Sequence, residues 1–231
     1  MSVAQYRNRL LLALSKADRG LLSSRLEPAE LGLRRSIEKS NTPISHIYFP
    51  ESGIISVVAK VANQQIEVGL IGREGMSGTA VLLGDHRSPH DVYVQMAGAG
   101  HRISAKHLSQ ALDASKTLRE CLQRYAHVFM VQVAQTAFAN GSATIDSRLA
   151  RWLLMAHDRQ DDDELSLTHE FIAVMLGVRR PGVTDALHRL EGKGLISAGR
   201  GFISIVRRKG LMALAGGAYG VAEAEYERLI G

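Results

Sequence analysis

The residues best suited to chemistry are polar and basic side chains between residues 168 and 200. Guanidinium groups bind phosphate oxygens, and an arginine can bind O6 and N7 of guanine with two hydrogen bonds. From Ser166 to Gly210 the chain has eight lysines and arginines against three acids, a local net charge of +5. The candidate contacts to double-stranded DNA are Thr168, His169, Arg179, Arg180, Gly182, Thr184, Asp185, His188, Arg189 and Arg200. Such a patch indicates a partner that carries phosphate.

Two short helices around a tight turn would position these side chains. In each segment the apolar residues recur at helical spacing, which predicts one buried face per helix. They are Phe171, Val174, Met175 and Val178 in the first helix, and Val183, Ala186, Leu187 and Leu190 in the second. Gly177 suits the end of the first helix, because glycine adopts the left-handed conformation without penalty, and Pro181 suits the first turn of the next. The pattern predicts a helix-turn-helix, with a helical hairpin that merely solvates its charged face as the alternative.

A β-hairpin is predicted directly after these helices. Residues 195–206 form two short β-like runs joined at residues 199–201, with Arg200 at the tip. Helices followed by such a hairpin indicate a winged helix-turn-helix. We expect Arg200, Arg207 and Arg208 to contact the sugar-phosphate backbone, which positions a protein on DNA without reading sequence.

The rest of the chain predicts helices at both ends of a β-rich region. An amphipathic helix is expected at Val3–Leu14, and a short helix or turn at Ala17–Leu26. Several short strands, typical of a β-sandwich or barrel, are expected at residues 44–49, 54–61, 65–71, 92–96 and 101–104. Further helices are expected at residues 105–140, 146–157 and 221–230.

An apolar stripe runs along the expected helix at residues 105–140. It consists of Leu118, Leu122, Tyr125, Phe129 and Val133. We interpret the stripe as the interface of a homodimer. A two-fold dimer would place two copies of the second helix roughly 34 Å apart, which matches one turn of DNA.

Composition excludes several classes of protein. The chain has 231 residues, is 45% apolar and carries a formal net charge of +5, which fits a globular protein with a nucleic-acid partner. Its one cysteine, Cys121, excludes an intramolecular disulfide and a four-cysteine cluster from one chain. We see no secretory signal and no apolar run of about 18 residues, so a reducing cytoplasm without a membrane partner is expected. The acidic run at residues 161–164 and the pair His86 and His90 are interpreted as solvated loops, and no metal or cofactor is expected.

Three segments together resemble the Crp/Fnr family of bacterial transcription regulators. They are residues 48–56 (Tyr-Phe-Pro-Glu-Ser-Gly-Ile-Ile-Ser), residues 147–154 (Ser-Arg-Leu-Ala-Arg-Trp-Leu-Leu) and residues 167–196. The resemblance implies an α+β fold with an N-terminal antiparallel β-roll of the cyclic-nucleotide-binding kind at 1–104, a central dimerisation helix at 105–144 and a winged helix-turn-helix at 145–231. It also implies a homodimeric, sequence-specific regulator that binds a double-stranded DNA operator, with RNA polymerase and a small-molecule effector as further candidate partners.

The second helix keeps part of the family's DNA-reading pattern. That helix typically begins Ser-Arg-Glu-Thr-Val, with another arginine two positions after the valine. Here Arg180 matches the arginine that reads guanine, while Pro181 and Asp185 replace the glutamate and the second arginine. Asp185 could accept a hydrogen bond from cytosine N4, or could pair with Arg189 one helical turn later. The operator should therefore differ from the family's usual half-site.

The effector segment departs further from the family. Members that bind cyclic nucleotides use Gly-Glu for the ribose and Arg-Ser or Arg-Thr for the phosphate. The corresponding candidates are Gly72, Glu74, Gly75, Arg87 and Ser88. The pair Arg87 and Ser88 aligns one residue early, and Pro89 removes a backbone N–H that a phosphate could use. We therefore expect no control by cyclic AMP, and the alternative for residues 72–78 is a tight turn between strands.

Three other functions stay open. One is a regulator that does respond to cyclic nucleotides. Another is a sensor that uses the winged helix only for contacts with proteins. The least favoured is an enzyme with Cys121 as nucleophile and His127 as base, because Cys121 falls within a helix where a packing role is commoner. An iron–sulfur cluster would need more cysteines.

Overall fold

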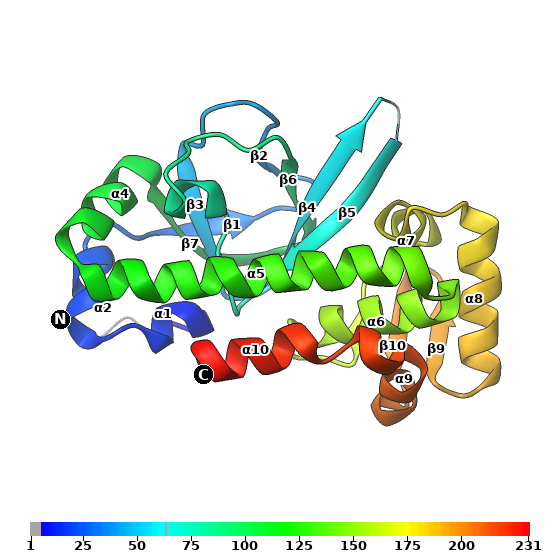
Figure 1. The fold of residues 1–231 in the computed structure, drawn as a ribbon. Coiled ribbons are helices and arrows are strands. Elements are labelled where there is room, and N and C mark those ends of the chain that lie inside the picture. The colour runs from blue at the N-terminus through cyan, green and yellow to red at the C-terminus, as the bar shows by residue number, and fades with distance from the viewer. Residues whose placement is uncertain (1–5, 63) are drawn as a thin grey trace. The chain divides into compact units, whose positions relative to one another are not determined.

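The computed structural model describes residues 6–62 and 64–231 (Figure 1). The chain divides into two compact units, and each unit combines segments that are distant in sequence. The first unit comprises the chain up to residue 57 together with residues 70–130 and 225–231. The second comprises residues 58–69 and 131–224. The start of the helix expected at Val3–Leu14 lies outside the described residues, and the described part contains α1 at Arg9–Ala13.

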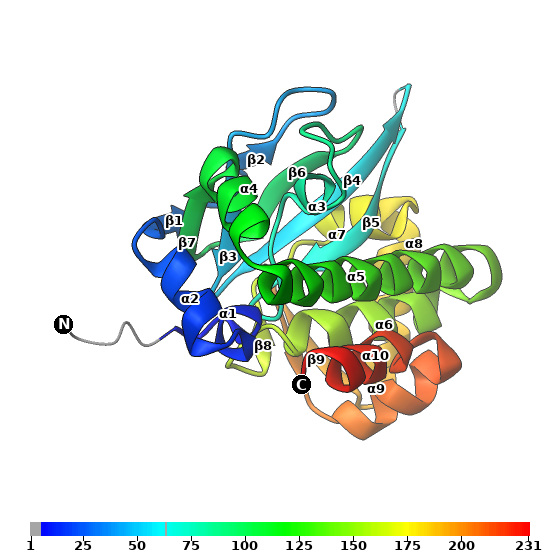
Figure 2. The same ribbon diagram turned by 60° about the vertical axis from the view of Figure 1, so that its left-hand side comes forward.

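Strands in two sheets form the framework of the first unit, and two of these strands continue into residues 58–69, which belong to the second unit (Figure 2). One sheet has the order β1-β7-β3 and the other the order β2-β6-β4-β5. The strands are β1 (Glu27–Leu31), β2 (Ser36–Glu38), β3 (His46–Pro50), β4 (Ile54–Val61), β5 (Gln64–Ile71), β6 (Asp91–Met96) and β7 (Gly98–Ser104). Ile47 of β3 and Ile103 of β7 are register partners and are both buried. The strands expected from β3 onwards are confirmed, whereas β1 and β2 were missed.

The helices of the first unit come before, between and after these strands along the chain. They are α1, α2 (Lys16–Ser23), α3 (Thr79–Leu82), α4 (Ala105–Ala114), α5 (Lys116–Ser142, continuing into the second unit) and α10 (Val221–Leu229, which ends in the first unit). The helical stretch expected at residues 105–140 is two helices, because Ser115 starts a new one. The Ser115 hydroxyl donates to Asp18 at 2.5 Å and accepts from the backbone N–H of Leu118 at 3.2 Å. Hydrogen bonding from Ser115 lowers the pKa of Asp18.

The core of the first unit joins the N-terminal helices, the strands and α5. Leu10, Leu11, Phe49, Leu108 and Leu122 are all fully or almost fully buried in it. Burial of such side chains stabilises the fold by about 1.5–3 kcal/mol each relative to leaving them exposed. Among residues 6–62 and 64–231, no helix is both long and apolar enough to cross a bilayer.

The second unit contains a helical domain with a small sheet. Its elements are α6 (Ile145–His157), β8 (Glu164–Leu165), α7 (His169–Leu176), α8 (Arg180–Gly192), β9 (Ile196–Gly199), β10 (Phe202–Ile205), α9 (Arg208–Ala215) and the 3-10 turn η1 (Gly216–Ala218). The sheet has the order β8-β10-β9. The expected α6, α7, α8 and the hairpin of β9 and β10 are confirmed. The two-residue β8 is too short to show a sequence period, and α9 was also missed.

Candidate nucleic-acid interface

Capping interactions fix both ends of α7. The Thr168 hydroxyl accepts a hydrogen bond from the backbone N–H of Phe171 at 3.2 Å, so Thr168 is the N-cap. Gly177 ends the helix with φ of +60°, as expected, and Arg148 donates to the carbonyl oxygen of Leu176. The position of Thr168 is therefore set by its role in the fold, which leaves its exposed side available to a ligand.

The expected buried face of α7 was wrong by about one position. The buried residues are Ile172, Ala173, Met175 and Leu176, whereas Phe171 and Val174 are only half-buried. Phe171 instead packs edge-on against Trp152 of α6, with ring centroids 5.7 Å apart. The expected face and the buried face of α7 overlap in part. Apolar residues occupy a wide arc of α7, because the helix has neighbours on more than one side.

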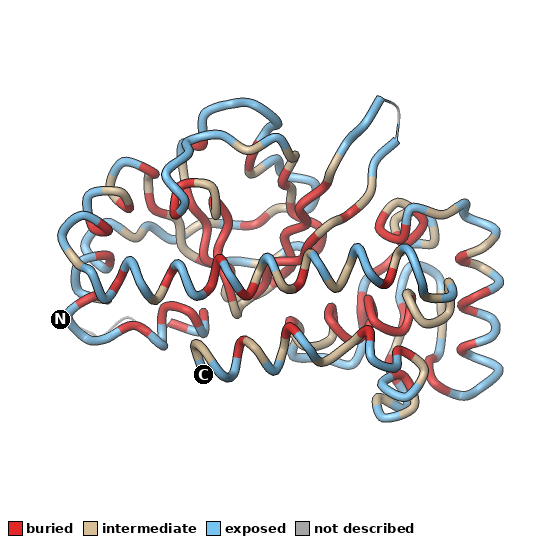
Figure 3. The backbone as a smooth tube through the Cα atoms, in the orientation of Figure 1, coloured by how far each residue is buried: buried red, intermediate tan, exposed pale blue. Residues whose placement is uncertain are grey.

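The faces of α8 agree with the sequence pattern. Val183, Ala186, Leu187 and Leu190 are fully buried. Arg179 and Arg180 at its N-terminal end are exposed, as are Asp185, His188 and Arg189 along it. Figure 3 shows buried and exposed positions alternating along α8. Pro181 lies in the first helical turn, where its missing N–H leaves no hydrogen bond unmade.

Three arginines keep their full hydrogen-bonding capacity. Arg179, Arg180 and Arg200 are exposed, and in the described part of the chain their side chains make no hydrogen bond or ion pair. A guanidinium carries five N–H donors and stays charged at neutral pH. These side chains can therefore bind phosphate or guanine without first breaking an internal contact.

Two other candidates in α8 already have partners. The Thr184 hydroxyl lies 3.0 Å from Nδ1 of His169, which ties the second turn of α8 to the start of α7. Arg189 binds the carboxylate of Asp146 in α6, with Nε–O distances of 3.0 and 2.9 Å and an Nη2–O distance of 2.6 Å. No ion pair joins Arg189 to Asp185 among the described residues, so the alternative of an intrahelical pair is not realised. Gly182 is half-buried, and a Cβ there would meet Ile145 at an ordinary 3.5 Å.

Arg200 lies at the tip of the hairpin of β9 and β10, whereas Arg207 and Arg208 make hydrogen bonds within the fold. Gly201, with φ of +86°, allows the tight connection between β9 and β10. Nε of Arg207 donates to the carbonyl oxygen of Gly194 at 2.9 Å, which caps the chain just after α8. Arg208 is half-buried and binds Asp158 at 2.6 Å and the hydroxyl of Tyr219 at 2.7 Å. The expectation that Arg208 contacts phosphate is therefore wrong, because both of its terminal nitrogens bind within the fold. Arg207 is exposed and remains a candidate for a phosphate contact.

Comparisons with known proteins agree with this geometry. Residues 147–214 match the family model of the Crp-like helix-turn-helix domain. The chain carries a Crp-like helix-turn-helix domain. The expected resemblance to the Crp/Fnr family is confirmed for this domain.

Solved structures show the same fold over most of the chain. A transcriptional regulator of the Crp/Fnr family from Eubacterium rectale is 20% identical, with 89% of this chain and 97% of that chain covered and a TM-score of 0.69. A Crp-family regulator from Thermus thermophilus is 18% identical, with 83% and 98% covered and a TM-score of 0.67. FixK2 from Bradyrhizobium japonicum is 15% identical, with 83% and 98% covered and a TM-score of 0.70. No curated protein sequence matches the chain.

The Crp-like domain is supported by residues that sequence reasoning missed. In the second unit, Nε1 of Trp152 donates to the buried carboxylate of Glu67 at 2.6 Å. A Cβ at Gly177 would lie 2.8 Å from Cδ1 of Ile66. The outer end of β5 therefore packs on the turn between α7 and α8. No local pattern could reveal these contacts, because they join residues far apart in sequence.

The turn at residues 72–76 is filled by the first unit itself. Gly72 and Gly75 are buried, and the backbone N–H of Gly75 donates to the carbonyl oxygen of Gly72 at 3.0 Å. Asn8 donates to the carbonyl oxygen of Gly75 at 2.9 Å. A Cβ at Gly75 would lie 2.2 Å from the hydroxyl of Tyr125, so only glycine fits there. Glu74 turns back to accept from the N–H of Gly72 at 3.2 Å.

The other half of the expected effector pocket has different neighbours. Arg87 is exposed and forms an isolated β-bridge with Pro43. The carbonyl oxygen of Ser88 accepts from the N–H of Asn41 at 2.7 Å. Arg87 is thus an exposed residue of this loop, whereas Gly75 contacts Asn8 and Tyr125.

Glu38 of β2 is a buried carboxylate that sequence reasoning missed. It accepts a hydrogen bond from the N–H of Gly78 at 2.7 Å, and burial raises its pKa. A lone glutamate in a three-residue strand carries no sequence signal of this role.

The expected dimer stripe is largely part of the core. Leu118, Leu122 and Tyr125 are buried within the first unit, and the Tyr125 hydroxyl donates to the carbonyl oxygen of Met76 at 3.0 Å. These three residues cannot form a surface interface, so that part of the expectation was wrong. Phe129 and Val133 are half-buried.

Proposed function

We propose that the chain binds a double-stranded DNA operator as a homodimer and regulates transcription there. The observation that carries the proposal is the exposed start of α8, where Arg179 and Arg180 have no internal partner. Helices of this kind place their first turns in the major groove of DNA. The match to a Crp-like helix-turn-helix domain supports the same assignment.

The residues divide by role. Arg180 reads guanine and Asp185 accepts from cytosine N4, since both are exposed at the start of α8. Backbone phosphates are bound by Arg179 and, from the wing, by Arg200. Around them we assign supporting contacts to Thr168, His169, Gly182, Thr184, His188 and Arg189, of which Arg189 acts while held by Asp146.

The proposed dimer interface moves to the exposed side of α5. Met130 and Phe138 are each 60% exposed and lie eight residues apart, which places them about 80° apart around the helix, on adjoining parts of its surface. Two large apolar side chains exposed on one helix face favour burial against a second copy of the chain. Phe129 and Val133 would border this face.

We divide the chain into three functional parts, residues 1–104, 105–144 and 145–231.

We propose that cyclic AMP does not control this regulator. The turn at residues 72–76 is buried against α1 and α5, and Arg87 lies exposed on a loop. Another small molecule could act as effector, and RNA polymerase would be contacted at the promoter. Such a regulator works where the chromosome is, in the cytoplasm, and we assign it no catalytic step.

Selection of bound sequences from random duplex DNA tests the proposal. We expect a two-fold symmetric site with half-sites about one helical turn apart, and binding that weakens steeply as salt increases. An asymmetric or single half-site would contradict the dimer. Absence of any enriched sequence, together with binding to other proteins, would favour a sensor that uses its winged helix for protein contacts.

A further inference from the structure

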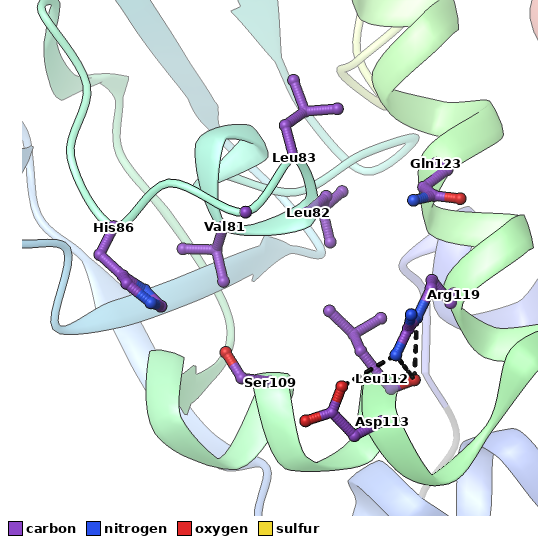
Figure 4. A pocket seen from close by; sticks show the side chains of 10 residues that line it. Val81, Leu82, Leu83, His86, Ser109, Leu112, Asp113, Arg119 and Gln123 are labelled. Atoms are coloured by element: carbon purple, nitrogen blue, oxygen red, sulfur yellow. Dashed lines mark hydrogen bonds and ion pairs between the residues drawn. The ribbon is translucent and has the colours of Figure 1, made fainter.

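A groove in the first unit is lined by none of the residues considered so far for effector binding. It has a volume of about 400 Å³ and lies between α3 with its following loop, α4 and the start of α5 (Figure 4). Sites for small molecules typically measure about 300–1,000 Å³. The groove is therefore large enough for a compact organic ligand.

The groove has an apolar floor and an apolar edge. Val81 and Leu82 of α3 and Leu112 of α4 are buried and line it. Leu83 also lines it and is 64% exposed, so its apolar surface is open to a ligand. Contact with the apolar part of a ligand would remove Leu83 from water and stabilise the complex.

Several polar groups around the groove have hydrogen-bonding capacity left. The side chains of His86, Ser109 and Gln123 line it, and among the described residues they make no hydrogen bond. Figure 4 shows His86 on one side of the groove, Gln123 and Arg119 together on the other side, and Ser109 below on α4. Convergent polar groups over an apolar floor are what a ligand with a polar end requires.

Arg119 supplies a fixed positive charge at the rim. Its Nε and Nη2 donate to the carbonyl oxygen of Leu112 at 3.1 and 2.9 Å, and Nη2 also donates to Asp113 at 2.8 Å. The backbone carbonyl holds the guanidinium in place, while no hydrogen bond within the described chain uses Nη1. The carboxylate of Asp113 is 82% exposed, so its ion pair with Arg119 is weak and open to exchange.

We propose that this groove binds a small amphipathic carboxylic acid. The acyl or aromatic body would lie on Leu82, Leu83 and Leu112, and the carboxylate would bind Nη1 of Arg119 and the amide of Gln123. A charged guanidinium favours a carboxylate over an uncharged polar group, because charge-assisted hydrogen bonds are the stronger ones. Binding fixes α3 and α4 against α5 and would make the acid an effector. That regulatory role rests on the proposed function, whereas binding itself does not.

Calorimetric titration of the full chain with octanoate and 1-octanol tests the inference without DNA. These probes share the same apolar chain and differ in the carboxylate. We expect octanoate to bind more tightly than 1-octanol. Leu83→Ser should weaken both probes by about threefold or more, since apolar contact is lost. Arg119→Gln should weaken octanoate by about tenfold and leave 1-octanol within about twofold.

Matched controls separate the groove from general effects on the fold. Leu33→Ser removes a leucine of similar exposure outside the groove, and Arg25→Gln removes an exposed arginine elsewhere. Both should leave octanoate affinity unchanged. Because Arg119 also holds Leu112, Gln123→Glu provides a second variant that adds negative charge at an exposed position and should weaken only octanoate.

Either of two results would overturn the proposal. One is that octanoate fails to bind the wild-type chain. The other is that Leu83→Ser and Gln123→Glu bind octanoate as well as the two controls do, which would place the ligand elsewhere. Loss of operator binding without loss of octanoate binding would contradict the proposed function alone.

Discussion

The start of α8 and the turn at residues 72–76 both carry residue types that bind anions, but they differ in what those groups already do. Arg179 and Arg180 are exposed and make no side-chain hydrogen bond in the described chain. In the turn, Asn8 and Tyr125 cover Gly75 from α1 and α5. A ligand would have to displace these contacts and leave buried polar groups unpaired, which costs about 1–3 kcal/mol for each group. Residue type alone therefore does not define a binding site, because the groups must also be accessible.

The same contrast runs along α5. Leu118 and Leu122 are fully buried by their own unit, whereas Met130 and Phe138 on the same helix are 60% exposed. An apolar stripe in a sequence shows that a face will be covered, but it does not show by what. Only the exposed residues can form an interface with another chain.

Disrupting the exposed face of α5 should have the largest effect. Phe138→Glu would place a charge in the proposed dimer interface, and we expect the protein to become monomeric. Operator affinity should fall by about a hundredfold or more, because two linked half-site contacts become one. Light scattering and DNA titration measure the two effects. Leu33→Glu, at an exposed leucine elsewhere, should change neither. A Phe138→Glu protein that remains dimeric would show that α5 does not form the interface.

Filling the turn at Gly75 should have the next largest effect. Gly75→Ala places a Cβ against the Tyr125 ring and should reduce the free energy of unfolding by about 1–3 kcal/mol. Chemical denaturation measures this change. The same substitution at Gly20 in α2 meets no atom within 4 Å and should be neutral or stabilising by up to about 1 kcal/mol. Equal stability of the Gly75→Ala protein would mean that the turn is loose enough to admit a ligand.

The parts of the fold that were predictable are those with local signals. The stripe of Val183, Ala186, Leu187 and Leu190 fixed the buried face of α8, and the hairpin of β9 and β10 followed from its glycines. Tertiary contacts decided the rest. Arg208 binds Asp158 and Tyr219 inside the fold, and Arg189 binds Asp146 rather than Asp185. Such partners lie beyond the reach of helical or strand periodicity.

Replacing Arg180 and replacing Arg200 should change DNA binding in different ways. Arg180→Ala should cost about 1–3 kcal/mol at one base pair and relax the preference there, because a bidentate contact to guanine is lost. Arg200→Ala should weaken binding to all DNA sequences alike. It should also lower the slope of log affinity against log salt by about one, which corresponds to one phosphate contact. Anisotropy titrations with operators mutated one base pair at a time, at two salt concentrations, measure both. If both variants lost affinity equally for all operator sequences, Arg180 would be a phosphate ligand.

Cyclic nucleotides should have no effect on the stability or the operator affinity of the protein. In the turn Gly75 is buried against the Tyr125 ring, and the exposed Arg87 lies on a loop that pairs with Pro43. A ligand that bound only the folded protein at 100 times its Kd would add about 2.7 kcal/mol of stability and raise Tm by several degrees. We therefore expect millimolar cyclic AMP or cyclic GMP to leave both Tm and operator affinity unchanged. A rise in Tm that disappears in Arg87→Ala would identify Arg87 as a phosphate ligand. It would also show that the turn and its covering residues rearrange to admit the nucleotide.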